Sequence, residues 1–455
     1  MIREEGCLLP QSACVVGAGY AGLCAARHLR QDYDVTILEQ QSDLGGMWLR
    51  RPGGGEGGYS ALYDNLTTNF PRQIMDFPDF TNRANPDSAS FVRPDEILKF
   101  LNDYADKFEL RKHALFASTV ERVRRVEDKW RVEWSRWQGE SRVLETKDFD
   151  LLFICSGHFG TPHVPAELRT AEFEGAFTHS KYYRSPAAYA DKKVAVIGAG
   201  PSGVDIAIDI ASEAKEVLLV YSSARSLMGQ EFPDNVVEIR ELPETLTKTG
   251  LLTASGRRLE VDAVVLCTGY EFRFDYLPPG LVKVDDNRVT PLYKEVAHVD
   301  YATSLFFIGL QRQVPVGWLA DAQMRFVLAA LLPAGGGGGG EHRRPRPPLP
   351  SRSVMLADER AEYERRRSLG LRHRKTHKLG HIDQATGRSL YRDYVDELAR
   401  CCRARLVDEA VVRVLEDVVC RPVSALRRLR YRILDEENFE AEAVEVALTS
   451  GAEHA

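Results

Sequence analysis

The sequence predicts an α/β protein, and three observations support this fold class. An apolar run over residues 13–16 precedes a glycine-rich turn, a helical pattern and a strand-like run that ends at Glu39. The same order recurs from Lys193 onward. Each copy is followed by a strand with a shared ending, DLLFICSGH from Asp150 and DAVVLCTGY from Asp262. We therefore expect two Rossmann-like dinucleotide-binding domains built from βαβ units.

Composition narrows the class of protein. The chain has 455 residues, 44% of them hydrophobic and 28% charged, which is ordinary for a globular protein of two or more domains. A net charge of -6 argues against a general nucleic-acid binder. Neither a signal peptide nor an apolar run of about 18 residues is recognisable. Eight cysteines without a CxxC pair are typical of free thiols in a reducing compartment. We expect a cytoplasmic protein without stable membrane insertion.

The first glycine-rich turn has the GxGxxG pattern of a dinucleotide site. Gly17 permits the tight turn, Gly19 lets the backbone approach a pyrophosphate, and Gly22 allows close packing of helix and strand. The N-terminus of the following helix offers free N–H groups to the anion. Glu39 stands near the offset of about 20 residues expected for the acid that binds a ribose hydroxyl.

The sequence after Glu39 favours FAD over NAD as the cofactor of this first unit. In SDLGGMW, Gly45 and Gly46 leave room for a second approach to the phosphates, and Trp48 offers a flat apolar surface. Taken alone, an aromatic residue after two glycines is more often explained by plain core packing. Only the position of Trp48 after the first glycine turn and Glu39 favours the flavin.

The second glycine-rich turn repeats the pattern. No acid follows its next strand where Glu39 follows the first, and that strand ends in YSSARS. A carboxylate there would repel a 2′-phosphate, whereas Ser223 and Arg225 can bind one, which favours NADPH. The alternative is that Arg225 is a solvated surface arginine. The residues of the second turn and helix start are Gly198, Gly200, Ser202, Gly203, Val204 and Asp205.

One flavin and one nicotinamide nucleotide imply hydride transfer from NADPH to FAD. Because the chain has no CxxC pair, it does not match a disulfide reductase, and O₂ is the leading acceptor. Two alternatives stay open at this point. One is an NADPH oxidase or quinone reductase, and the other is a non-catalytic Rossmann-type binding protein.

The stretch FEGAFTHSKYY connects the chain to a known family. Phe173, Gly175, His179 and Tyr183 fit FxGxxxHxxx-aromatic, the signature of class B flavoprotein monooxygenases. The chain resembles the flavin-containing monooxygenases (dimethylaniline monooxygenase-like). Because the sequence shows no apolar C-terminal anchor, it is more similar to the soluble insect type than to the microsomal vertebrate members. The related Baeyer-Villiger enzymes have Trp followed by Pro or Asp at the end of this signature, whereas this chain has Tyr183 and Arg184. The other shared motifs are GGMW, NLTTNFPRQIMDFPDF, CSGH, CTGY, IGLQRQ and ADAQMRF.

The resemblance implies an activity and a set of site residues. Such an enzyme forms a C4a-hydroperoxyflavin from FAD, NADPH and O₂, and N- or S-oxygenates small nucleophilic amines or sulfides, including xenobiotics and plant alkaloids. Asn69 is then the active-site asparagine that hydrogen-bonds the hydroperoxide, and capping of a turn is its alternative role. Thr68 lies with it between flavin and nicotinamide, and no metal is required. The residues that hold FAD are Gly17, Ala18, Gly19, Tyr20, Ala21, Gly22, Glu39, Met47 and Trp48.

The expected organisation places a smaller NADPH-binding domain inside the FAD-binding domain. We expect the His179 stretch to join the two domains without reacting. A run of six glycines is expected to be a flexible linker. The basic cluster over residues 365–375 is interpreted as a solvated helix face rather than a lipid contact, and a homodimer is compatible with the sequence. The predicted boundaries are 1–163 and 278–334 for FAD, 164–277 for NADPH, 335–352 for the linker and 353–455 for a helical C-terminal segment.

Overall fold

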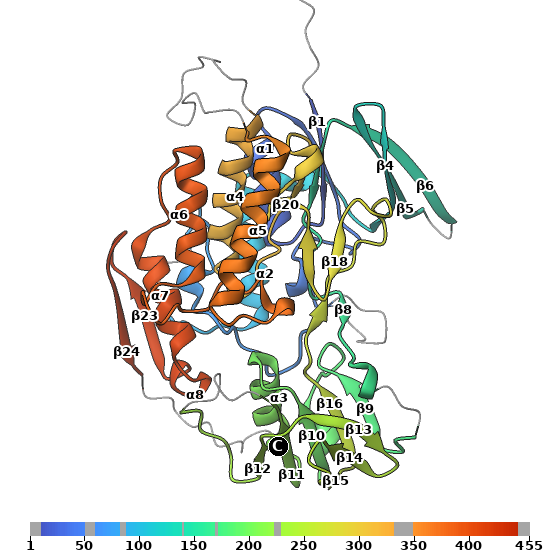
Figure 1. The fold of residues 1–455 in the computed structure, drawn as a ribbon, viewed down its shortest axis with the longest axis vertical. Coiled ribbons are helices and arrows are strands. Elements are labelled where there is room, and N and C mark those ends of the chain that lie inside the picture. The colour runs from blue at the N-terminus through green and yellow to red at the C-terminus, as the bar shows by residue number, and fades with distance from the viewer. Residues whose placement is uncertain are drawn as a thin grey trace, which may run out of the picture.

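Two sheets organise the structure, a computed structural model (Figure 1); the smaller is parallel throughout, and the larger is parallel except for the antiparallel pairs β20-β21 and β21-β22 at one edge. The larger sheet has seven strands in the order β20-β21-β22-β7-β1-β2-β3. Their bounds are β20 Leu292–Tyr293, β21 Ala297–His298, β22 Leu305–Phe307, β7 Leu151–Ile154, β1 Ser12–Val16, β2 Asp34–Leu38 and β3 Ala114–Leu115. The structure describes residues 11–50, 60–81, 88–138, 141–168, 172–222, 229–331 and 349–444.

The first βαβ unit lies at the centre of the seven-stranded sheet. β1 pairs in parallel with β2 on one side and with β7 on the other, so that Cys14 is opposite both Thr36 and Leu152. All five residues of β1 are buried, as expected for a central parallel strand covered on both faces. Helix α1 (Tyr20–Leu29) packs against helix α4 (Val316–Leu331) over this sheet. The sequence prediction of this unit is confirmed.

The second βαβ unit has a parallel sheet of its own, in the order β12-β11-β10-β16-β9. Helix α3 (Pro201–Ala211) follows β10, and the unit lies below the larger sheet in Figure 1. The strands are β12 Val236–Ile239, β11 Glu216–Val220, β10 Lys193–Ile197, β16 Ala263–Leu266 and β9 Ala176–His179. The α/β fold class with two Rossmann-like units is thus confirmed, while the predicted domain boundaries stay a proposal.

The chain passes between the two units at two places that lie side by side. β8 (Thr161–Pro162) leads into the second unit and pairs in an antiparallel manner with β17 (Tyr270–Glu271), which leads back out of it. The predicted boundaries near residues 163 and 277 fall close to this two-stranded crossing. A two-stranded connection of this kind is what an inserted domain requires.

Smaller antiparallel elements complete both units. One three-stranded sheet projects beside the larger sheet, and another covers the second unit (Figure 1). The first consists of β4 Ser118–Val126, β5 Lys129–Gln138 and β6 Ser141–Phe149, and the second of β13 Pro243–Thr247, β14 Gly250–Thr253 and β15 Arg258–Glu260. The remaining elements are helix α2 Pro94–Lys107 and the hairpin β18 Lys283–Asp285 with β19 Arg288–Thr290.

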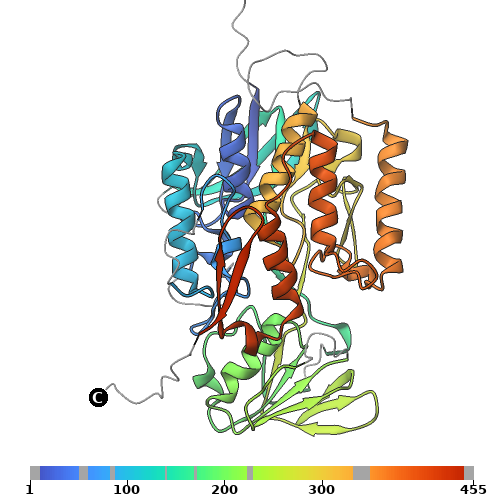
Figure 2. The ribbon, with the colours of Figure 1, turned by 90° about the vertical axis from the view of Figure 1, so that its left-hand side faces the viewer.

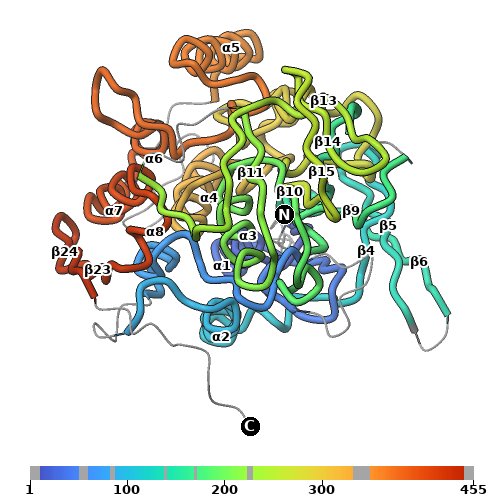
Figure 3. The backbone as a smooth tube through the Cα atoms, turned by 90° about the horizontal axis from the view of Figure 1, so that it is seen from below, coloured from blue at the N-terminus to red at the C-terminus, as the bar shows by residue number. Residues whose placement is uncertain are grey.

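The C-terminal segment is helical, as expected, but it ends in a hairpin that the sequence pattern did not predict. Helices α5 to α8 curve around one side of the molecule (Figure 3), and the hairpin stands beside α7 (Figure 2). The charged residues of this hairpin suggest a solvated helix, but β23 and β24 pair in an antiparallel manner, and Tyr431 is buried. The bounds are α5 Arg352–Ser368, α6 Leu390–Cys402, α7 Glu409–Cys420, α8 Val423–Leu426, β23 Leu429–Ile433 and β24 Phe439–Ala443.

The described residues bear on three further features of the sequence. Within them, no helix is long and apolar enough to cross a membrane, and no group of side chains has the composition of a metal site. Cys14, Cys24, Cys155 and Cys267 are buried thiols. The run of glycines at 335–340 lies outside the described residues, so its role as a linker stays a prediction.

Candidate functional site

The first glycine turn has the geometry that its sequence predicts. Gly17 has φ +102°, and a Cβ atom there would lie 2.7 Å from the carbonyl oxygen of Cys155 at the end of β7. A Cβ atom on Gly22 would lie 1.8 Å from the carbonyl oxygen of Gly17. Both positions therefore exclude a side chain, the first by backbone conformation and both by close packing. The turn brings the start of α1 to the carboxyl edge of the sheet, where α/β proteins bind their nucleotides.

The two glycines of SDLGGMW pack against this turn. A Cβ atom on Gly46 would lie 3.0 Å from the Cα atom of Gly19, and the Gly45 N–H donates to the carbonyl oxygen of Ala18 at 3.0 Å. The pair therefore supports the backbone of the glycine turn, and its part in a second approach to the phosphates stays a prediction. Trp48 follows in a short 3-10 helix and is half-buried against the main core, and the Met47 carbonyl oxygen accepts from Ser60.

Glu39 is buried at the end of β2, where it holds the glycine turn. Its Oε2 accepts the Ala18 N–H at 2.7 Å, and its Oε1 accepts the Gln41 N–H at 2.8 Å. These two bonds fix the carboxylate beside the glycine turn. The position expected from the sequence offset is thus occupied by a preorganised acceptor. Further along α1, Tyr20 donates its hydroxyl to the Met75 carbonyl oxygen, and Ala21 lies against Gly309.

The second glycine turn repeats the construction of the first. Gly198 has φ +108°, and a Cβ atom there would lie 2.5 Å from the carbonyl oxygen of Cys267. A Cβ atom on Gly203 would lie 1.8 Å from the carbonyl oxygen of Gly198, the same value as in the first turn. By contrast, a Cβ atom on Gly200 would meet no atom of the described residues within 4 Å. Gly200 therefore faces open space, as the approach of a pyrophosphate requires.

Both helices that follow the turns are open to an anion at their N-termini. α1 begins after Gly19 and α3 after Gly200, and in neither case does a side chain cap the helix or an acid stand in its first turn. The first N–H groups therefore lack an intrahelical partner, and the helix dipole favours a negative ligand. Ser202 is exposed in the first turn of α3, and Val204 is buried. The residues of both turns fit the diphosphate groups of two dinucleotides.

Asp205 has a protein partner that the sequence did not indicate. It is buried in α3, and its Oδ1 accepts a hydrogen bond from Nη2 of Arg427 at 2.7 Å. Burial raises the pKa of Asp205 to about 6, and the attraction of Arg427 offsets only part of that effect. The carboxylate thus faces the C-terminal segment, while its predicted contact with NADPH stays a prediction. Ser223 and Arg225 lie outside the described residues, so their binding of the 2′-phosphate of NADPH is likewise still a prediction.

Thr68 and Asn69 are placed by a short backbone pairing with Val92. The Thr68 N–H donates to the Val92 carbonyl oxygen at 2.9 Å, and the Thr68 hydroxyl accepts the Val92 N–H at 3.1 Å. The next side chain, Asn69, is exposed and makes no hydrogen bond to another described residue. Its amide is therefore available to a ligand, and Thr68 fixes the backbone that carries it.

The residues of the FxGxxxH signature hold the second unit together. His179 is buried, and its Nδ1 accepts the Lys181 N–H, so the proton lies on Nε2, which donates to the Gly269 carbonyl oxygen at 3.0 Å. Burial lowers the pKa of His179 to about 4. A Cβ atom on Gly175 would lie 2.4 Å from the ring of Phe173. These contacts support an architectural role.

Tyr183 connects the signature to the first unit. Its hydroxyl donates to Oδ2 of Asp209 on α3 at 2.6 Å, and its ring meets Tyr63 edge-on at a centroid distance of 5.4 Å. The Asp64 N–H donates to the carbonyl oxygen of Arg184 at 2.8 Å. The stretch therefore lies where the two units meet. Sequence reasoning missed Tyr63, Asp209 and Arg427, because a single tyrosine, aspartate or arginine carries no motif.

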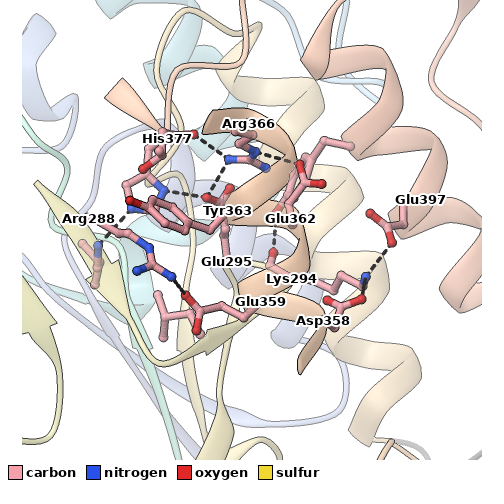
Figure 4. A pocket seen from close by; sticks show the side chains of 14 residues that line it. Arg288, Lys294, Glu295, Asp358, Glu359, Glu362, Tyr363, Arg366, His377 and Glu397 are labelled. Atoms are coloured by element: carbon pink, nitrogen blue, oxygen red, sulfur yellow. Dashed lines mark hydrogen bonds and ion pairs between the residues drawn. The ribbon is translucent and has the colours of Figure 1, made fainter. Parts of the chain in front are cut away.

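Figure 4 shows a cluster of charged side chains that includes residues of α5. Arg366 on α5 is fully buried and contacts Glu295 at 2.8 Å and Glu362 at 2.7 Å, and Nδ1 of His377 contacts Glu295 at 2.7 Å. Burial pushes the pKa of Glu295 up, but the charges of Arg366 and His377 outweigh it and hold that pKa far below its ordinary value. The cavity here is about 40 Å³, room for little more than water. The cluster attaches α5 to the larger sheet.

Comparison with known proteins places the chain among flavoenzymes. The family model described as flavin-binding monooxygenase-like matches residues 11–235 and 231–408. The flavin-containing monooxygenase FMO GS-OX2 of Arabidopsis thaliana is 31% identical over 93% of both chains, and FMO GS-OX4 of the same plant is 33% identical over 81% of both. Among solved structures, S-allyl-L-cysteine S-oxygenase from Allium sativum has a TM-score of 0.77 and 29% identity, covering 90% of this chain and 92% of its own. Tmm from Pelagibacter sp. strain HTCC7211 shares the fold, with a TM-score of 0.76 and 21% identity over 95% and 96%.

Proposed function

The chain belongs to the flavin-binding monooxygenase-like family, and we propose that it oxygenates the sulfur atom of small thioethers. It is an FAD-dependent monooxygenase, and its family uses FAD and NADPH. The choice of sulfur over nitrogen, which the sequence left open, is supported by the S-allyl-L-cysteine S-oxygenase, similar over 90% of this chain. The native substrate and a cytoplasmic location are predictions.

The observation that carries the proposal is the pair of matched glycine turns. Each stands at the carboxyl end of a central parallel strand, and each precedes a helix with an uncapped N-terminus. We propose that the first turn, with Glu39, holds FAD and that the second turn, with Arg225, holds NADPH. When bound, FAD accepts a hydride from NADPH, reacts with O₂ and supplies one oxygen atom to a soft nucleophile.

The protein's own residues contribute to this chemistry by positioning the groups that bind the cofactor and the transferred oxygen. Glu39 fixes the first turn through the Ala18 N–H, so the backbone that faces the pyrophosphate is preorganised. Thr68 presents Asn69, whose amide can donate to one oxygen atom and accept from another without supplying an acidic proton. We assign Asn69 the role of hydrogen-bonding the oxygen that is transferred. His179 and Tyr183 maintain the second unit and its contact with the first.

The test is product analysis with matched sulfides and amines. The purified enzyme, saturated with FAD, is incubated with NADPH, O₂ and pairs of substrates that differ only in a sulfur or nitrogen centre, and the products are identified by mass spectrometry. One sulfoxide per NADPH is expected. If amine oxides are the main products, the enzyme oxygenates nitrogen and the proposed S-oxygenation is wrong. NADPH consumption that yields only hydrogen peroxide or a reduced quinone would support the oxidase alternative, and no consumption would support a binding protein.

A further inference from the structure

The C-terminal strap, which we define as residues 422–431, contacts both nucleotide-binding units. It begins just after α7, contains α8, and ends in β23 (Figures 1 and 2). α8 packs against α3 of the second unit, while β23 packs beside residues 72–74 of the first. The stretch of Tyr183 and Arg184 joins the units as well, through Tyr63 and Asp64. The strap is thus a second connection between the units and a candidate for controlling how they sit relative to one another.

The contacts with the second unit centre on α3. Arg427 donates to Asp205, whose side chain is 3% exposed, at 2.7 Å. Val423 packs against the core of this unit, and the Ser424 hydroxyl accepts the Glu231 N–H at 3.3 Å. Asp205 stands two residues after Gly203, in the helix that follows the second glycine turn. The strap therefore contacts the helix whose N-terminus faces the predicted NADPH site.

The contacts with the first unit centre on Tyr431. Its N–H donates to the Ser90 hydroxyl at 2.8 Å, and its carbonyl oxygen accepts from Nε2 of Gln73 at 2.7 Å. Its hydroxyl donates to Asp417 on α7 at 2.6 Å, and its side chain is fully buried. Each of these bonds holds the end of the strap in place, because breaking one would leave a buried polar group unpaired.

Only four positions separate the two anchors along the chain. Four residues span at most about 14 Å when fully extended, and Arg427 pairs with the second unit while Tyr431 binds the first. A displacement of α3 from the first unit that exceeds what this short segment can follow would break the ion pair or detach β23. The ion pair is the more exposed of the two, with 34% of the Arg427 side chain accessible.

We propose that the Arg427–Asp205 ion pair is a latch that sets the orientation of the NADPH-binding unit toward the flavin. Arg427 is in this view a positioning residue for hydride transfer, since it fixes the helix that follows the second glycine turn. Hydride transfer is sensitive to small displacements, because an error of about 1 Å in position can cost on the order of 10²-fold in rate. The inference rests on the proposed function only in requiring that NADPH reduces FAD across the two units.

The test is the anaerobic reduction of enzyme-bound FAD by NADPH, followed by stopped-flow absorbance. Arg427→Gln is expected to lower the limiting rate at saturating NADPH by roughly 10- to 100-fold, with little change in the half-saturating NADPH concentration and with FAD retained. Arg427→Lys, which keeps the charge, should recover part of the rate. Arg428→Gln is the matched control: its ion pair with Glu231 is exposed on both sides, at 3.1 Å, and its loss should leave the rate unchanged.

Hydrogen exchange gives a readout that is independent of activity. In Arg427→Gln, but not in Arg428→Gln, amide exchange should increase in α3 and β23. Asp205→Asn removes the same ion pair from the other side with little change in shape, and adding it to Arg427→Gln should slow reduction no further. A wild-type reduction rate in Arg427→Gln would overturn the latch, as would an effect confined to NADPH affinity or an equal effect of Arg428→Gln. Loss of FAD from both Arg427→Gln and Asp205→Asn would also overturn it.

The two proposals fail in distinguishable ways. Reduction of FAD by NADPH is measured without O₂ and without a sulfide or amine. If the enzyme forms no sulfoxide but reduces FAD slowly only in the latch variants, the proposed substrate class is wrong and the latch stands. If sulfoxide forms and all variants reduce FAD equally fast, the latch is wrong and the function stands.

Discussion

Gly198 and Cys267 meet so closely that a Cβ atom on the glycine would lie 2.5 Å from the cysteine carbonyl oxygen, whereas Gly200, two residues on, faces open space. The two glycines thus serve different purposes. Gly198 is required by the protein itself, because it has φ +108° and touches the end of β16. No contact among the described residues requires Gly200 to be glycine, so its lack of a side chain points to a ligand.

Gly200→Ala should therefore weaken NADPH binding without loss of stability. We expect an increase of about tenfold or more in the dissociation constant, on the order of 1.4 kcal/mol, with an unchanged melting temperature and full FAD content. Gly198→Ala should instead destabilise the protein by about 1–3 kcal/mol, because alanine is strained at this φ. Titration calorimetry with NADP⁺ and thermal unfolding measure the two effects. Equal NADPH affinity in Gly200→Ala would place the pyrophosphate elsewhere.

Asn69→Leu should uncouple NADPH consumption from oxygenation. Leucine is similar in size but makes no hydrogen bond, so FAD binding and its reduction by NADPH should persist. Oxygenated product should fall by about 10²–10³-fold, the loss seen when one preorganised donor at a developing charge is removed, and hydrogen peroxide should take its place. Peroxide and product are measured side by side on flavin-replete enzyme. Unchanged product per NADPH would remove Asn69 from the mechanism and leave it as a turn cap.

Arg225→Ala should separate the two nicotinamide coenzymes. If Arg225 binds the 2′-phosphate, its loss should weaken NADPH by roughly 1.5–3 kcal/mol, the range for hydrogen bonds to charged groups. NADH lacks that phosphate and should be little affected. The measurement is the half-saturating concentration of each coenzyme for FAD reduction. A similar loss for both coenzymes would show that Arg225 acts on the fold or on the shared part of the dinucleotide.

His179 should make stability depend on pH in the acid range. Burial lowers its pKa to about 4, whereas an unfolded histidine has a pKa of about 6.5. The unfolded chain therefore binds the proton first, and stability is lost as the pH falls from about 6.5 toward 4, by on the order of 3 kcal/mol. His179→Gln keeps a donor for Gly269 and an acceptor for Lys181, but it does not titrate. Denaturant unfolding at pH 7.5 and pH 5 should show a smaller loss in the variant than in the wild type, and equal losses would contradict this account.

Arg366→Met should strongly lower the free energy of unfolding. The amount of oxygenated product per NADPH consumed should stay the same. Removing one partner of a buried ion pair leaves an uncompensated charge, here Glu295 and Glu362, at a cost of about 3–5 kcal/mol. Arg360→Met on the same helix is the matched control, because its ion pair with Glu364 is exposed and exposed pairs contribute roughly 0–1 kcal/mol. Equilibrium unfolding measures both changes. Similar stabilities for the two variants would show that the buried cluster contributes little.

The sequence alone determined the two nucleotide-binding units and the family. Strand, turn and helix of each unit are local: the positions of Gly17 and Gly198 follow from patterns that span some thirty residues, and the structure confirms the strands and helices on either side. Backbone conformation and close packing impose these glycines wherever a strand turns directly into a helix. Because the same constraints act in every such unit, a short motif suffices to recognise them.

Only the tertiary structure decided which distant residues meet. Arg427 reaches Asp205 across more than two hundred positions, Tyr431 anchors the hairpin to Ser90, and Glu39 holds the Ala18 N–H. An arginine in a charged C-terminal segment has the same local sequence whether it is solvated or paired, since its environment is supplied by segments packed against it from elsewhere in the chain. The family's motifs thus locate the two nucleotides, but the orientation of one unit toward the other depends on contacts for which the sequence has no periodic signal.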